Sequence, residues 1–131
     1  SATSYKALRE DALAAERWNR LHPTEPPRTP YVTEALSGAS GPVVAVTDFM
    51  KSVPDQVSRW VPATYAALGT DGYGRSDTRA QLRRHFETDA QHVVVAVLSN
   101  LVHTDDAKPQ EVADAIAAYG LDPEAIDPLV A

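Results

Sequence analysis

Apolar residues recur at helical spacing over residues 4–21, the first periodic stretch of the chain. The positions on this face are Leu8, Ala12, Ala15, Trp18 and Leu21. His22-Pro23 ends the predicted helix, because the residue before a proline is disfavoured in the α conformation. A connector over 22–30 follows and holds four of the ten prolines. A short helix is then expected at about 31–36, with Pro30 near its start.

Two apolar segments predict strands. Residues 43–47 are continuously apolar and β-branched, without alternation, which is typical of a strand covered on both faces in a parallel sheet. Residues 64–68 predict a second, shorter strand. Between them, the spacing predicts a helix over about 49–61, with Pro54 marking a delayed start. Its expected inward residues are Met50, Val53, Val57 and Trp60 or Val61.

The second half of the chain predicts helices. The first covers residues 77–87. The run Val93 to Leu98 favours a strand on propensity alone. However, Thr88-Asp89-Ala90-Gln91 matches a capping box, and the polar residues that follow have helical spacing, so we predict a helix over 89–102. Pro109 opens a last helix, which Gly120 ends.

The order helix, strand, helix, strand, helices indicates an α/β layer pattern. Only two strands are clear, with room for a third at Ser1–Thr3, and a parallel sheet usually has more. We therefore expect an open, mostly parallel sheet with flanking helices that lacks its first strand or strands.

Composition narrows the functional classes. The 131 residues suffice for one domain, and the apolar share of 44% is ordinary for a soluble protein. A net charge of −6 argues against nucleic acid as a partner. The chain has one basic cluster, formed by Arg75, Arg79, Arg83 and Arg84. We interpret it as a solvated helix face in preference to a docking site for acidic residues of another domain. The absence of cysteine excludes disulfides and thiol catalysis and fits the cytoplasm. No apolar run is long enough to predict a membrane span.

The segment 69–77 contains the glycine pattern G-x-x-G-x-G between a predicted strand and a predicted helix start at Ser76 or Asp77. Such a place can bind an anion with backbone N–H groups, or simply turn the chain. The spacing fits neither the dinucleotide fingerprint nor the P-loop, so a structural turn is favoured. The candidates for inter-domain or anion contacts are Asp71, Tyr73, Arg75 and Ser76, with Asp71 and Arg75 placed to pair with each other.

No catalytic, cofactor-binding or metal-binding residue is predicted from the remaining polar positions. The four histidines, at 22, 85, 92 and 103, form no metal-ligand pattern and are interpreted as surface or interface residues. No serine lies in a G-x-S-x-G elbow. Trp18 and Trp60 occupy apolar helical positions and are expected to pack in the core.

Several blocks of sequence, in order, resemble one family. They are Glu16 to Pro23, Pro27 to Tyr31, Thr47 to Lys51, Leu68 to Asp77, Leu82 to Glu87, Val112 to Ile116 and Pro128 to Ala131. The family is the homodimeric bacterial type of pyruvate dehydrogenase, the thiamine-dependent first component of its complex. The resemblance runs over essentially the whole chain, so residues 1–131 look like part of the C-terminal domain of that long polypeptide.

The resemblance implies a domain like the C-terminal domain of transketolase, which begins upstream of Ser1. It also implies an enzyme that decarboxylates pyruvate on thiamine diphosphate held with magnesium, and acetylates a lipoyl group of the acyltransferase component. In the family, the earlier domains bind the cofactor and carry the active-site residues. Their Gly-Asp-Gly motif is not matched here, because Thr70 precedes Asp71. No catalytic or cofactor residue is therefore carried over, and this chain alone is expected to be inactive.

The function that the resemblance implies is a structural and dimerisation domain of this oxidoreductase. Its partners would be the rest of the polypeptide, a homodimer mate and the dihydrolipoyl acyltransferase component, in the cytoplasm. Two alternatives stay open. The chain could be an interaction module that docks another component of the complex, or a stand-alone anion-binding α/β domain that uses residues 69–77.

Overall fold

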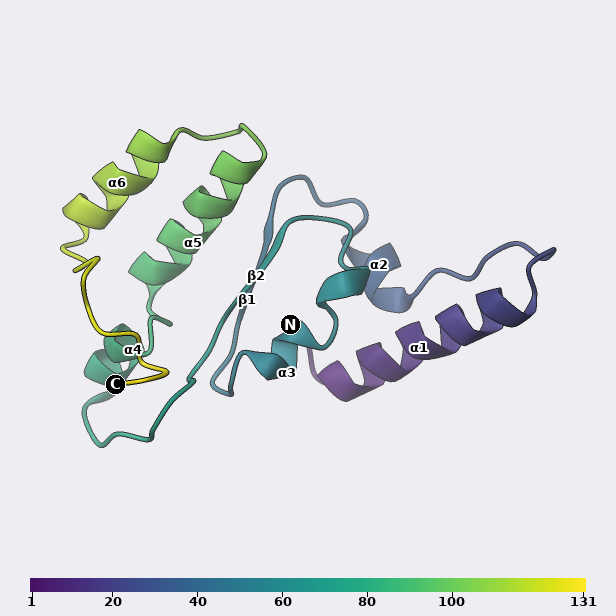
Figure 1. Ribbon diagram of the computed structural model, residues 1–131, viewed down its shortest axis with the longest axis horizontal. Coiled ribbons are helices and arrows are strands. Elements are labelled where there is room, and N and C mark those ends of the chain that lie inside the picture. The colour runs from purple at the N-terminus through teal and green to yellow at the C-terminus, as the bar shows by residue number, and fades with distance from the viewer.

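The computed structural model describes residues 1–131 as a small parallel sheet flanked by helices (Figure 1). In chain order the elements are α1 (Tyr5–Leu21), α2 (Tyr31–Leu36), β1 (Val43–Val46), α3 (Ser52–Asp55), the 3₁₀ helix η1 (Ser58–Trp60), β2 (Tyr65–Leu68), α4 (Arg79–His85), α5 (Ala90–His103) and α6 (Pro109–Ala118). This is the predicted open α/β arrangement. No helix combines the length and the apolar character that a membrane span requires.

The helices at the start of the chain follow their local signals. The Ser4 hydroxyl accepts a hydrogen bond from the Ala7 N–H at 3.1 Å and so caps α1, as serine does at many helix starts. α1 ends at Leu21, two residues before Pro23, as predicted. α2 lies beside α1 after the proline-rich connector (Figure 1).

The sheet consists of β1 and β2, paired in parallel with Val43 opposite Tyr65 and Val46 opposite Leu68. Both predicted strands are confirmed. The third strand considered at Ser1–Thr3 is wrong, because these residues form no ladder with β1. The helices α5 and α6 lie on one side of the sheet, and α1 to α3 lie on the other (Figure 1).

The core is small. Val32 of α2 packs with Val57 and Val61, and Val43 and Tyr65 of the sheet pack against them. The expectation that the first strand is covered on both faces is wrong, since β1 is only partly buried and Val46 is 45% exposed. The reason is that α5 and the small core shield the sheet only partly and neither strand has a second neighbour.

The segment 49–61 differs from the predicted single helix. It forms α3, of four residues, and η1, of three residues. After Asp55 the backbone hydrogen bonds reach back three residues instead of four. The Val57 N–H, for example, donates to the Pro54 carbonyl at 3.4 Å. Val57 and Val61 point inward as predicted, but Met50 is 58% exposed and lies before α3. Burial of Val57 and Val61 therefore decides the backbone here, over continuation of the helix.

Two helices are capped by a residue next to the one that the sequence predicted. Thr78, not Ser76 or Asp77, caps α4 by accepting from the Gln81 N–H at 3.3 Å. Asp89, not Thr88, caps α5 by accepting from the His92 N–H at 3.0 Å. The helical interpretation of 89–102 is confirmed, because α5 covers Ala90–His103.

α6 ends as predicted at Gly120. Gly120 has a φ of 60°. Its N–H donates to Ala117 and the Leu121 N–H donates to Ile116, which is the Schellman pattern of helix ends. The tail after α6 then returns to the segment between β2 and α4, where Pro128 meets Gly72 (Figure 1).

The chain exposes much surface for its size. Its accessible surface is 8838 Å², and nine of its 131 residues are buried. A compact monomer of 14.1 kDa exposes about 6,700 Å², so this fold exposes about 2,100 Å² more.

Candidate functional site

The glycine-rich segment 69–77, which we call the glycine corner, joins β2 to α4. At its start, Gly69 lies against the loop that follows β1. A Cβ on Gly69 would stand 2.5 Å from the Phe49 carbonyl oxygen. The Thr70 N–H donates to the same oxygen at 2.9 Å, and the Thr70 hydroxyl donates to the Asp48 carbonyl at 2.7 Å. Gly69 therefore allows two loops to meet backbone to backbone.

Asp71 is used inside the chain. Its carboxylate accepts a hydrogen bond from the Lys51 N–H at 2.9 Å and so holds the residue before α3. The sequence placed Asp71 to pair with Arg75. That pairing is wrong, since Arg75 forms no ion pair in the chain.

Gly72 admits the C-terminal tail. It has a φ of 97°, and a Cβ at this position would stand 2.0 Å from the Pro128 carbonyl oxygen and 3.3 Å from the Leu129 Cα. Pro128 is buried by this contact, although most of the tail is exposed. The corner is thus a junction of three segments that lie far apart in the sequence.

At Gly69 and Gly72 the corner meets carbonyl oxygens of the chain itself instead of presenting a cradle to an anion. A phosphate cradle presents free backbone N–H groups to the anion. Here the carbonyl oxygens of Phe49 and Pro128 point at Gly69 and Gly72, and the Thr70 N–H is already bonded. The structure also holds no group of three or more His, Cys, Asp or Glu side chains that could bind a metal.

The other candidates at the corner stay free. Tyr73 is 80% exposed, and the side chains of Arg75 and Ser76 are exposed and form no hydrogen bond or ion pair within the chain. All three lie beyond Gly72, on the part of the corner that faces solvent. They are available to a partner, in contrast to Asp71.

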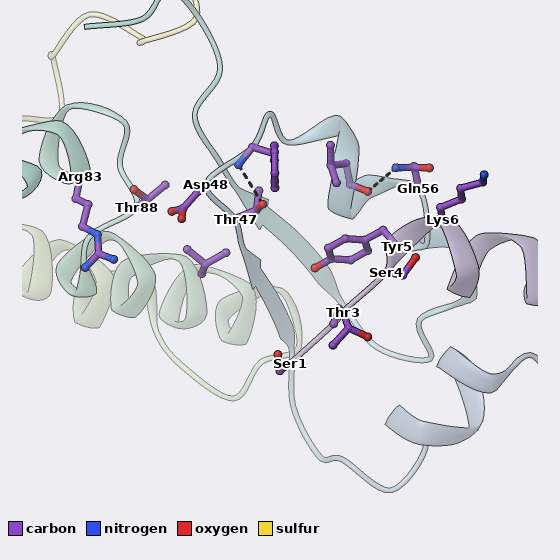
Figure 2. A pocket seen from close by; sticks show the side chains of 14 residues that line it. Ser1, Thr3, Ser4, Tyr5, Lys6, Thr47, Asp48, Gln56, Arg83 and Thr88 are labelled. Carbon is purple, nitrogen blue, oxygen red and sulfur yellow. Dashed lines mark hydrogen bonds between the residues drawn. The ribbon is translucent and has the colours of Figure 1, made fainter. Parts of the chain in front are cut away.

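An open cavity of about 740 Å³ lies at the carboxyl end of β1 (Figure 2). Residues 1–6 and 46–49 line one part of it, and Arg83 and Thr88 line another. A neighbouring cavity of about 380 Å³ shares Asp48, Arg83 and Thr88. Ligands of open α/β sheets bind at such ends. However, the lining contains no nucleophile hydrogen-bonded to a base, so the cavity supports no catalytic assignment.

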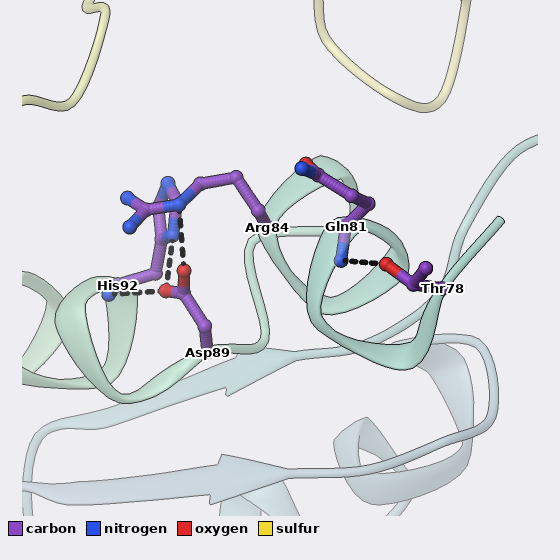
Figure 3. A network of polar contacts seen from close by, with 5 residues as sticks. All are labelled: Thr78, Gln81, Arg84, Asp89 and His92. Carbon is purple, nitrogen blue, oxygen red and sulfur yellow. Dashed lines mark hydrogen bonds and ion pairs between the residues drawn. The ribbon is translucent and has the colours of Figure 1, made fainter.

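Asp89 forms a polar network that the sequence analysis missed (Figure 3). Its carboxylate binds the Arg84 Nε at 2.9 Å and the His92 Nδ1 at 2.6 Å, besides capping α5. Burial raises the pKa of Asp89, but the hydrogen bonds from His92 and the charge of Arg84 outweigh it, so the pKa lies below its ordinary value. The network ties α4 to α5. In the sequence, the only signal for this network was an acidic residue at a helix start with a basic residue five positions before it.

The histidines do not gather at one place. His22 stacks on Trp18 with ring centroids 4.4 Å apart, and His85 meets Phe86 edge to face at 4.8 Å. His92 binds Asp89, and His103 is exposed at the end of α5. The rings of His22 and His85 thus serve local packing, and that of His92 supports the residue that caps α5.

Trp60 packs against the small core, whereas Trp18 lies outside that cluster. The Arg28 guanidinium lies 4.2 Å above the Trp18 ring, and the Trp60 Nε1 donates to Glu16 at 2.8 Å. Both rings are partly buried. The predicted core packing is confirmed for Trp60, whereas Trp18 packs against His22 and Arg28.

Residues 1–89 match the family described as the transketolase-like TK C-terminal domain. This match covers more than half of the 131 residues. The chain belongs to this family. Its open α/β fold with a parallel sheet agrees with that assignment.

Curated relatives extend the match to the whole chain. The pyruvate dehydrogenase E1 component of Pseudomonas aeruginosa is 52% identical over 130 residues, which is 98% of this chain and 15% of that protein. The proteins of the same name from Haemophilus influenzae and Escherichia coli are 52% and 48% identical, over 100% of this chain and 15% of each relative. The chain therefore spans about 15% of the length of the curated relatives it matches. The resemblance seen in the sequence blocks is confirmed.

Proposed function

We propose that this chain acts as the C-terminal domain of a pyruvate dehydrogenase of the E1 type. The observation that carries the proposal is an identity of 48–52% over essentially the whole chain with enzymes of that name, of which it spans only 15%. In such an enzyme, thiamine diphosphate and magnesium supply the chemistry that decarboxylates pyruvate, between glycolysis and acetyl-CoA. The acetyl unit then passes to the lipoyl group of the acyltransferase component.

The role of this chain is support, without a catalytic group of its own. Its partners are the rest of the enzyme polypeptide and a homodimer mate, and its compartment is the cytoplasm. Two features favour this role. No nucleophile and base meet in its cavities, and its surface exceeds that of a compact monomer by about 2,100 Å². We expect the chain alone to be inactive and to gain its function by packing against other domains.

The edge of the sheet gives the proposal a structural basis. The Val43 N–H donates to Thr64 at 2.8 Å and the Thr47 N–H donates to Leu68 at 3.0 Å. Because alternate residues of a strand point their N–H groups to opposite sides, those of Val44 and Val46 point away from β2. The free edge of β1 can accept a further strand, and a sheet of only two strands gains stability when one is added. Additional strands of the larger enzyme complete the sheet here.

A chimera tests the proposal. This chain replaces the matched stretch of the Pseudomonas aeruginosa enzyme, and a second protein lacks that stretch. We expect the chimera to decarboxylate pyruvate at no less than about a tenth of the parent rate, equal to a loss of at most about 1.4 kcal/mol. The deletion should be inactive. A chimera that is dimeric and folded but as inactive as the deletion would contradict the proposal.

A second candidate is an interaction module that docks the acyltransferase or another component of the complex. The free side chains of Tyr73 and Arg75 favour it, because tyrosine and arginine are enriched at protein interfaces. Calorimetric titration of the chimera with the binding domain of the acyltransferase decides the matter. Heat that disappears in an Arg75→Ala chimera supports the module, and no heat in the parent chimera removes it. The third idea, a stand-alone anion binder, is disfavoured by the carbonyl oxygens at Gly69 and Gly72.

A further inference from the structure

Large apolar side chains stand exposed around the glycine corner. They are Phe49 at 68%, Met50 at 58%, Tyr73 at 80%, Leu129 at 57% and Val130 at 74% of their full exposure. They come from the loop after β1, from the corner itself and from the C-terminal tail. We call these five residues the apolar rim. One exposed apolar residue is ordinary, but a group of them marks an interaction surface.

The three segments of the rim are held together by the contacts of the corner. The Phe49 carbonyl meets Gly69, and the backbone of Leu129 meets Gly72. These glycines are three residues apart, which limits their separation to about 11 Å. Hydrogen bonds from Thr70 and to Asp71 also fix the loop that carries Phe49 and Met50. The rim is therefore a preorganised surface of one corner, and binding there requires little ordering.

We infer that the apolar rim docks against another domain of the enzyme polypeptide that the proposed function requires. The inference rests on that proposed function. An obligate interface buries about 1,000–2,500 Å² on each side, which matches the surplus of about 2,100 Å² that this fold exposes. The relatives, of which the chain spans 15%, contain enough further polypeptide to cover it.

The surroundings of the rim define the docking surface. Arg75, Arg79 and Arg83 are exposed and unpaired beside it, so the occupant is an apolar protein surface bordered by carboxylates. Asp48 and Asp77 lie close by and line the same cavity as Arg79 and Arg83. These carboxylates disfavour burial of the corner in lipid. A second copy of the chain and a separate component of the complex are the competing occupants.

Two matched double variants of the chimera test the inference. Phe49→Ser with Tyr73→Ser removes the centre of the rim. Leu21→Ser with Tyr31→Ser removes two apolar residues of comparable exposure, 55% and 63%, on α1 and α2. We expect the rim variant to lose at least about tenfold in activity, while the control stays near the parent. Equal behaviour of the two variants overturns the inference.

Hydroxyl-radical footprinting gives a readout that needs no substitution. We expect the labelling of Phe49, Met50 and Tyr73 to fall strongly from the free 131-residue chain to the chimera, and that of Leu21 and Tyr31 to change little. Equal labelling of the rim in both overturns the inference even when the chimera is active. Protection of the rim already in the free chain, together with a dimer mass, assigns it to a second copy and also overturns it. An inactive but protected chimera would contradict the proposed function and leave the rim as a docking surface.

Discussion

Gly69 and Gly72 both face carbonyl oxygens of the chain itself, but only Gly72 also has a backbone conformation that other residues avoid. Gly74, two positions on, has no heavy atom within 4 Å of the place where a Cβ would stand. The same turn therefore contains two glycines that the fold requires, Gly69 and Gly72, and one, Gly74, that it tolerates losing.

Gly72→Ala should lower the free energy of unfolding by about 1–3 kcal/mol, because the new Cβ meets the Pro128 carbonyl at a φ that alanine disfavours. Gly74→Ala is the matched control and should change it by less than about 0.5 kcal/mol. Urea denaturation measures both. Amide exchange at Val130, whose N–H donates to Asp127 within the tail, should also become faster in Gly72→Ala. Equal stability of the two variants would remove the structural role of Gly72.

The partly buried hydroxyl of Tyr65 leads us to expect a loss of folding stability at alkaline pH. Its hydroxyl donates to the Pro54 carbonyl at 2.8 Å, and burial, with smaller contributions from Tyr5 and Asp55, raises its pKa to about 12. Because this value lies above the ordinary 10.0, the stabilisation is complete below pH 10 and is lost as the pH rises toward 12. Absorbance titration of tyrosinate should show one of the five tyrosines titrating late, and Tyr65→Phe should abolish that step. If all five tyrosines titrated together near pH 10, the raised pKa of Tyr65 would be contradicted.

Among the elements, α4 and α5 are joined by Asp89 with Arg84 and His92 (Figure 3). The pKa of Asp89 lies below its ordinary value of 3.8, so its contribution to stability is present above that pH and is lost as the pH falls further. Asp89→Ala should lower the free energy of unfolding at pH 7 by about 1–2 kcal/mol through loss of the cap.

Asp89→Asn is the matched variant for the charge of this network. The amide oxygen should keep much of the cap, while the part of the acid dependence that comes from Asp89 should disappear, because asparagine does not titrate. Urea unfolding at a series of pH values from about 7 down to about 3 compares this variant with the wild type. The same loss of stability on acidification in both proteins would show that the Asp89 carboxylate does not contribute to it.

Most elements could be predicted because their signals are local. Ser4 and Pro23 bound α1, the glycine at 120 ends α6, and β-branched residues mark β1. The segment 49–61 could not be predicted, since the burial of Val57 and Val61 against α2 depends on contacts distant in the sequence. The predicted starts of α4 and α5 were wrong by one or two residues. In each, several adjacent residues can cap a helix, and the fold selects one of them.

The sequence located the glycine corner but not its contacts. The partners of Gly69 and Gly72 lie 20 and 56 positions away, at Phe49 and Pro128, and no spacing rule reports such distances. The expected pair of Asp71 with Arg75 does not form, and the Asp71 carboxylate accepts from the Lys51 N–H instead. Only the tertiary structure separates Asp71, which is used internally, from the exposed Tyr73.

At the scale of the whole molecule, the fold is a two-stranded parallel sheet with a small core and a large surface. Isolated two-stranded sheets are marginal in water, and parallel sheets are normally covered on both faces. Membership of the transketolase-like C-terminal family and the match to 15% of each long relative agree with a unit that other domains cover. The sheet edge and the apolar rim are the two surfaces at which we place those contacts.

The most direct measurement is amide hydrogen exchange along β1, in the free chain and in the chimera. The N–H groups of Val43 and Thr47 are bonded to residues 64 and 68 and serve as the internal reference. In the free chain, Val44 and Val46 should exchange faster than this reference. In the chimera, a neighbouring strand should slow them by at least about a thousandfold, close to the reference. Exchange of Val44 and Val46 that is as fast in the chimera as in the free chain would contradict completion of the sheet by the larger enzyme.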